Sequence, residues 1–165
     1  MGVGNWIKGL FVGGLIGISS ANSVDAFSFI DQNRLYDNSW SESQIDQRKA
    51  IWKVLNRELS DHKFHLLRVA FDNLDRECSK SERQLLSLKK RLKDGDQPPY
   101  SVKPFIKEGN DNLSVIRDFM NKHKSDLTKT QIEQLIVLSK MYADELKSNC
   151  DEMVNLMKPY QKHVY

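Results

Sequence analysis

The stretch from Ser41 to Lys93 contains neither glycine nor proline, and this constrains the fold more than any other feature of the sequence. Its apolar residues recur at intervals of three, four and seven, the spacing of one helix face, first at Ile45, Trp52, Leu55, Leu59, Leu66 and Val69. The apolar stripe then shifts to Phe71, Leu74, Cys78, Leu85, Leu88 and Leu92. A single helix over 41–93 would be roughly 80 Å long, so we expect it to bend or break near 78–81, where Ser79-x-x-Glu82 resembles a capping pattern.

Two more helices follow a connecting segment over 94–110, which begins with Asp94-Gly95 and contains Pro98-Pro99. The pattern predicts a short helix over 111–124 and a long one over 128–157. No segment alternates between apolar and polar residues in the manner of a strand. The sequence therefore predicts an all-α fold, an elongated three- or four-helix bundle with long helices, formed by one domain over 41–165.

An apolar leader precedes the helical domain. Residues 1–21 carry a single charge, Lys8, and an uninterrupted apolar run of about ten residues that is followed by small residues, as in a secretory signal peptide. The alternative is a retained membrane-inserted helix, because Gly9, Gly13 and Gly17 would line one packing face. The apolar run is shorter than the about 20 residues that a spanning helix needs, which favours cleavage. Residues 22–40 are expected to form an irregular arm.

The two main helices are predicted to start with the same chemistry. The segments Trp40-Ser41-x-x-Gln44 and Leu127-Thr128-x-x-Gln131 each place a hydroxyl three residues before a glutamine, as in a capping box. In each box the hydroxyl accepts from the glutamine amide, and the glutamine side chain bonds back to the amide of the capping residue. Trp40 and Leu127 stand in hydrophobic-staple positions.

Leu127-Thr128-x-x-Gln131 resembles the LTxxQ motif of small exported helical proteins of the CpxP/Spy type, and Trp40-Ser41-x-x-Gln44 departs from that motif at its first two residues. The resemblance covers these positions, the leader, the length and the helical content. It implies a dimeric, ATP-independent chaperone or an envelope-stress adaptor that binds its clients through a cradle-shaped surface.

The remaining signals for chemistry are few. Cys78 and Cys150 both lie on apolar stripes, and in an oxidising compartment they could form a disulfide between two helices. Glu58, His62 and His65 would share one face of an unbroken helix, which we interpret as a polar flank rather than a metal site. We therefore assign no catalytic residue, metal or cofactor.

The 25 basic and 22 acidic residues are mixed along the chain, without the basic stripe of a nucleic-acid-binding protein. We expect a non-enzymatic exported protein, periplasmic or secreted, that binds other proteins as a chaperone, inhibitor or adaptor and could form homo-oligomers. The alternative is an accessory or structural subunit of a larger assembly, anchored to a membrane by an uncleaved leader, with its helical domain outside the cytosol.

Overall fold

Four long helices make up most of the computed structural model, which describes residues 27–31 and 41–160. They are α2 (Glu42–Glu58), α3 (His65–Lys93), α4 (Lys103–Lys122) and α5 (Lys129–Met157). Short 3₁₀ turns lie between or after them, and no strand occurs in these residues. The fold is an all-α helical bundle, as the sequence predicts.

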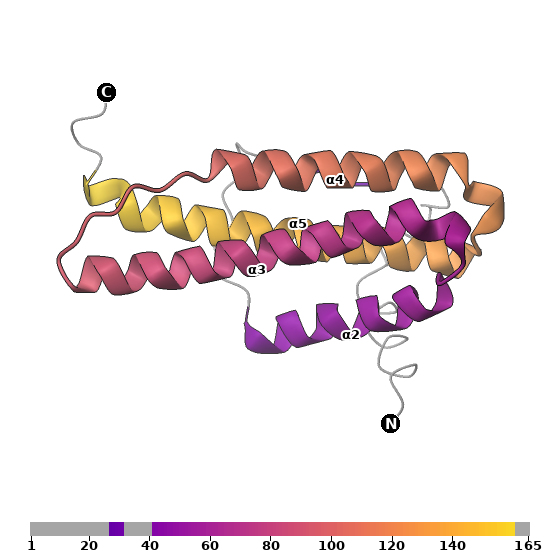
Figure 1. Cartoon of the computed structure of the whole chain (residues 1–165), viewed down its shortest axis with the longest axis horizontal. Coiled ribbons are helices and arrows are strands. Elements are labelled where there is room, and N and C mark those ends of the chain that lie inside the picture. The colour runs from indigo at the N-terminus through magenta and orange to yellow at the C-terminus, as the bar shows by residue number, and fades with distance from the viewer. Residues whose placement is uncertain (1–26, 32–40, 161–165) are drawn as a thin grey trace.

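The helices form an elongated bundle in which α5 is the central element (Figure 1). Helices α3 and α5 run in the same direction, because Cys78 contacts Tyr142, Ser81 contacts Asn149 and Lys89 pairs with Glu152. Helix α4 runs the opposite way and packs against both, whereas the shorter α2 packs on α5. From Glu145 to Asp151 every residue of α5 is buried, so this part of the helix is enclosed on all sides.

Both capping boxes form. The hydroxyl of Ser41 accepts from the amide of Gln44 at 3.3 Å, and the Gln44 side chain accepts from the Ser41 amide at 2.9 Å. Thr128 and Gln131 make the same pair of bonds, each at 3.0 Å. These reciprocal bonds satisfy amides that a helix start leaves without partners. Leu127 is buried at the second box, whereas Trp40 lies outside the described residues.

The break in the 41–93 segment lies at 59–61 and not near 78–81, which corrects the sequence-based position. Asp61 starts the next turn by accepting from the amide of Lys63 at 3.0 Å, and Arg68 donates to the carbonyl of Leu59 at 3.0 Å. At 78–81 the helix continues, because the Ser81 hydroxyl bonds to the Cys78 carbonyl within α3 and accepts from Asn149 of α5.

The break changes which residues of α3 face the core. Leu67 is fully buried and Phe64 is 5% exposed, whereas Leu66 is 62% and Val69 39% exposed. The sequence stripe placed Leu66 and Val69 inside because it assumed one continuous helical phase from Ile45. The interruption at 59–61 restarts the helical phase, so Leu67 faces the core in place of Leu66.

Helix α4 begins at Lys103 rather than 111, so the connection covers only 94–102. Pro104 lies in the first turn of α4, where its missing amide hydrogen costs no helical bond. Gly95 has a φ of +84°, a left-handed conformation that suits glycine just after a helix end.

Several sequence-based predictions concern residues outside the described part of the chain. The leader over 1–21 with Gly9, Gly13 and Gly17, and most of the arm over 22–40, belong to this group. Within the described ranges, none of the helices combines the length and the apolar character that crossing a membrane requires.

Replacing Thr128 by Ala removes the hydroxyl that caps α5, and we expect a loss of about 1 kcal/mol in the free energy of unfolding. Thr130→Ala is the matched control, because Thr130 is exposed in the first turn of the same helix. Thr128→Ser should retain most of the stability. Urea unfolding followed by circular dichroism measures all three variants, and equal losses in Thr128→Ala and Thr130→Ala would contradict the capping role.

Candidate functional site: a buried ionic cluster and an exposed apolar patch

A buried ionic cluster joins α2 to α3 and α5. Arg48 of α2 is 1% exposed, and its Nε donates to Oε2 of Glu145, which is also 1% exposed. The Nη1 of Arg48 lies 2.8 Å from Oδ1 of Asp75, whose side chain is 38% exposed. One guanidinium therefore contacts a carboxylate from each of the two helices against which α2 lies.

Aromatic rings surround this cluster. The Arg48 guanidinium carbon lies 4.3 Å from the centre of the Tyr142 ring, a cation–π contact. The Tyr142 hydroxyl lies 3.5 Å from Asp75 Oδ1. On the α2 side, Trp52 donates through Nε1 to Asp72 at 3.2 Å, and its ring centre lies 4.9 Å from that of Phe71. Polar and apolar contacts thus hold the same face of α2 against α3 and α5.

Burial dominates the electrostatics of the cluster. It raises the pKa of the Glu145 carboxyl, and the hydrogen bond and charge of Arg48 oppose that rise. For Arg48, burial alone would lower the pKa, but the bond to Glu145 and the nearby charges raise it above its ordinary value. Burial also raises the pKa of Tyr142. Arg48 therefore stays charged, and its role in the cluster is to hold the two acids.

Sequence reasoning missed this cluster, because it identified neither Arg48 nor Glu145 as a site residue. A signal was present, because Arg48 falls between Ile45 and Trp52 at helical spacing, on the apolar side of α2. Glu145 falls within the buried part of α5 in the same way. A charge on an apolar face indicates a buried partner of opposite sign, although it does not identify that partner.

Cys78 and Cys150 are both buried free thiols, so the hypothesised disulfide between them is not present. The reason is the register of α3 on α5. The Cys78 sulfur lies 3.5 Å from the carbonyl of Tyr142, and Tyr142 precedes Cys150 by eight residues, about 12 Å along the helix axis. A disulfide requires α-carbons that are roughly 4.4–6.8 Å apart. Burial raises the pKa of both thiols.

The histidines near the break do not share a helix face with Glu58. Glu58 ends α2, whereas His62 belongs to the short turn after the break and His65 begins α3. The two imidazole rings stack with their centres 5.8 Å apart. In the described residues, no group of three or more acidic, histidine or cysteine side chains is arranged to hold a metal ion.

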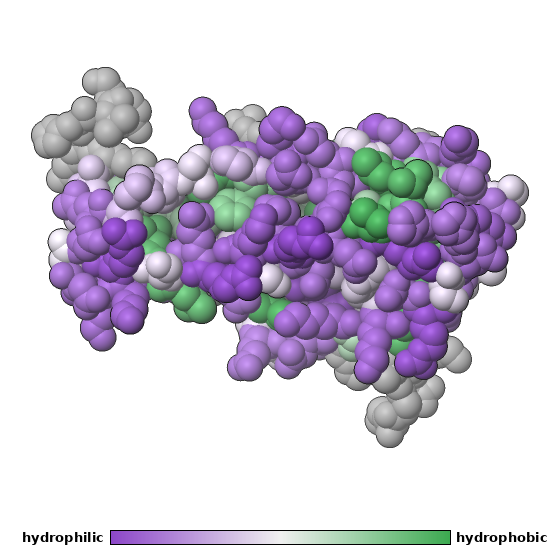
Figure 2. Space-filling model, in the orientation of Figure 1, coloured by the Kyte–Doolittle hydropathy of each residue, from purple (hydrophilic) through white to green (hydrophobic). Residues whose placement is uncertain are grey.

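The α3–α4 patch, which we define as Leu66, Val69 and Val115, is an exposed apolar surface at the outer junction of two helices. The exposed fractions of the three side chains are 62%, 39% and 43%. Two contacts bracket them, Phe64 with Phe119 and Asn73 with Asn112. Figure 2 shows apolar atoms exposed over this part of α3 and α4 among hydrophilic surroundings. The other strongly exposed large apolar residues in the described ranges are Leu86 and Tyr160.

Of the residues that the sequence singled out, Ser41 with Gln44 and Thr128 with Gln131 lie at helix starts, where each pair forms a capping box. Comparisons with protein-family models, with curated proteins and with solved structures found no match to this chain. The arguments that follow therefore rest on the residues themselves.

Replacing Glu145 by Leu leaves the Arg48 charge buried without its main partner, and we expect a loss of about 3–5 kcal/mol in unfolding free energy, measured by urea denaturation. The double variant Arg48→Met/Glu145→Leu should recover most of that loss, because it removes both charges. Asp75→Ala, at the half-exposed end of the cluster, should cost about 1 kcal/mol or less.

The pH dependence provides a second check of this cluster. In Arg48→Met, Glu145 is buried without its cation, so its folded-state pKa rises further above the unfolded value. An acid with a raised folded-state pKa favours the folded state at low pH, and this contribution is lost as the pH rises through that pKa. The loss caused by Arg48→Met should therefore be smaller at pH 5 than at pH 8. Equal losses at both pH values would contradict a buried Glu145 that depends on Arg48.

Proposed function

We propose that this chain is an exported, non-enzymatic helical protein that binds another protein through the α3–α4 patch. The observation that carries the proposal is the exposure of Leu66, Val69 and Val115 on adjoining helices. The core does not need these side chains, because Leu67, Ile116 and Met120 are fully buried behind them. Apolar side chains that gather on a surface lose contact with water when a partner covers them, and this favours association.

The arrangement of the patch suits a protein partner. Its members come from two helices that pack side by side, so their spacing is fixed by the bundle rather than by a loop. A partner helix could lay an apolar face across such a junction. The ionic cluster joins α2 to α3 and α5, and so supports α3, one of the two helices that present the patch.

The compartment and the chaperone or adaptor role belong to the same proposal. The leader over 1–21 supports export, and the resemblance of Leu127-Thr128-x-x-Gln131 to the LTxxQ motif supports a chaperone or an adaptor of the cell envelope. Cys78 and Cys150 are buried as free thiols. A buried thiol packs as a small apolar side chain, so export to an oxidising compartment does not require a disulfide between them.

A photo-crosslinking residue placed at position 66 tests the binding surface in the cells that naturally make the protein. We expect specific adducts from position 66, and we expect them to disappear when Val115→Glu is added, because a charge would disrupt the patch. The same probe at Leu86 is the matched control, since Leu86 is 57% exposed at the other end of α3. Identical adducts from both positions, or none from position 66, would contradict the proposal.

A further inference from the structure

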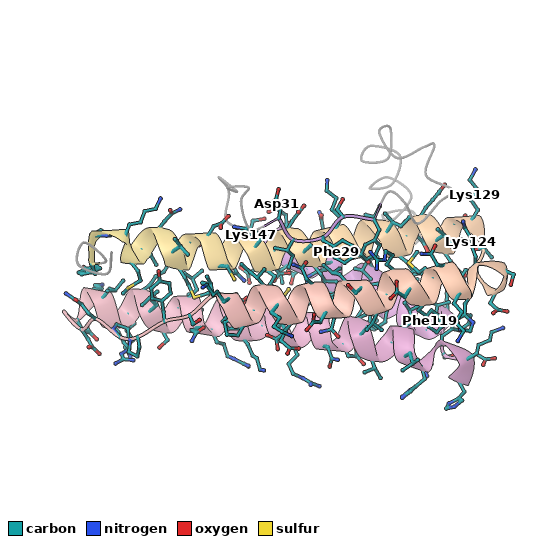
Figure 3. All side chains as sticks on the ribbon, turned by 90° about the horizontal axis from the view of Figure 1, so that it is seen from above. Phe29, Asp31, Phe119, Lys124, Lys129 and Lys147 are labelled. Carbon is teal, nitrogen blue, oxygen red and sulfur yellow. The ribbon has the colours of Figure 1, made fainter. Side chains whose placement is uncertain are left out.

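Residues 27–31 are the part of the arm that the structure describes, and they lie in an extended form across the surface between α4 and α5 (Figure 3). Phe27 is 9% and Ile30 is 4% exposed, so the arm is anchored by buried side chains. Its described contacts are made with α4 and α5, helices that lie far along the chain, since Ile30 and its partner Asn110 are 80 residues apart. None of these contacts involves α2, the helix that follows the arm in sequence.

Asn110 of α4 binds the backbone of the arm at one residue. Its Oδ1 accepts from the amide of Ile30 at 2.9 Å, and its Nδ2 donates to the carbonyl of the same residue at 3.3 Å. A side-chain amide that pairs with both backbone groups of one residue acts as a neighbouring strand would. This contact recognises an extended backbone and does not depend on the side chain of the bound residue.

Gly109 makes room for the arm. A β-carbon at this position would lie 2.7 Å from Cδ1 of Ile30 and 2.7 Å from Cδ2 of Leu146. The glycine therefore permits the Ile30 side chain to lie between α4 and α5 against Leu146. Together with the paired bonds of Asn110, this forms a groove that accepts an extended segment with an aliphatic residue.

Arg117 adds a contact for the aromatic residue that precedes Ile30. Its guanidinium carbon lies 5.0 Å from the centre of the Phe29 ring, within the range of a cation–π contact. The ring of Phe27 packs edge-on against that of Phe29 with 5.5 Å between their centres. The groove thus accommodates an aromatic residue followed by an aliphatic residue in extended form.

We propose that this groove is an acceptor site for the arm of a second copy of this chain, so that two copies associate by exchanging arms. The contacts of Asn110, Gly109 and Arg117 join the arm to α4 and α5, and a second copy presents the same atoms. Exchange of an identical element is a low-cost route to dimers, because each interaction broken within one chain forms again between the two chains. Attachment to its own chain keeps the arm at a high effective concentration near its own groove, which opposes exchange. Exchange therefore increases as the protein concentration rises towards that effective concentration.

Two variants that complement each other test arm exchange directly. The arm variant Phe29→Ser/Ile30→Ser keeps an intact groove, and the groove variant Asn110→Ala/Arg117→Ala keeps an intact arm. We expect each to sediment as a monomer alone and an equimolar mixture to form a 1:1 complex. In the mixture, neither chain can fill its own groove, so the intact arm of one binds the intact groove of the other without competition.

The control mixture replaces the groove variant with one that also carries Phe29→Ser/Ile30→Ser, so that no intact arm is present. This mixture should remain monomeric. Lys122→Ala, an exposed change in the last turn of α4, should leave the complex unchanged. The proposal is overturned if the complementary mixture stays monomeric at concentrations on the order of 100 μM. It is also overturned if the control mixture associates equally, and that outcome would assign association to another surface such as the α3–α4 patch.

A measurement on the unaltered chain applies if a variant loses its helical circular dichroism. The amide of Ile30 donates to Asn110, so its hydrogen exchange reports whether the arm occupies a groove. We expect a synthetic peptide with the sequence of residues 25–33 to accelerate this exchange by displacing the arm. An unchanged exchange rate at millimolar peptide would overturn the proposal.

Discussion

The interruption at Leu59–Asp61 is the constraint on which the rest of this structure depends. It arises from local chemistry, because Asp61 caps the turn that follows and Arg68 satisfies the Leu59 carbonyl at the end of α2. Without it, residues 41–93 would form one helix too long for the remaining helices to cover. With it, α2 folds back along the bundle, and α3 starts in a new helical phase.

Two consequences of the interruption connect the fold to the proposed function. The return of α2 brings Arg48 to Glu145, a pair of residues 97 positions apart, and this ionic contact helps to enclose α5. The new phase of α3 turns Leu67 into the core and Leu66 outward, next to α4. The patch that we propose as a binding surface is therefore a product of the same break that places the ionic cluster.

The parts of the fold that depend on neighbouring residues were predictable from the sequence, whereas those that depend on register between helices were not. The capping chemistry of Ser41 and Thr128 and the extent of α5 follow from residues within a few positions of each other. The break was placed incorrectly because the Ser79-x-x-Glu82 pattern resembles a cap more closely than Asp61 does. The register of α3 on α5 separates Cys78 from Cys150, and no spacing within the chain contains that information.

The reactivity of single cysteines introduced at positions 66 and 67 tests the phase of α3 most directly. Cys78 and Cys150 form an unreactive background, because both are buried and burial raises the pKa of Cys150 to about 12. The account predicts that Leu66→Cys reacts with a maleimide in the folded protein at least about ten-fold faster than Leu67→Cys, whose reaction requires opening of the structure. Equal rates, or a faster reaction at position 67, would contradict the phase reset and the surface derived from it.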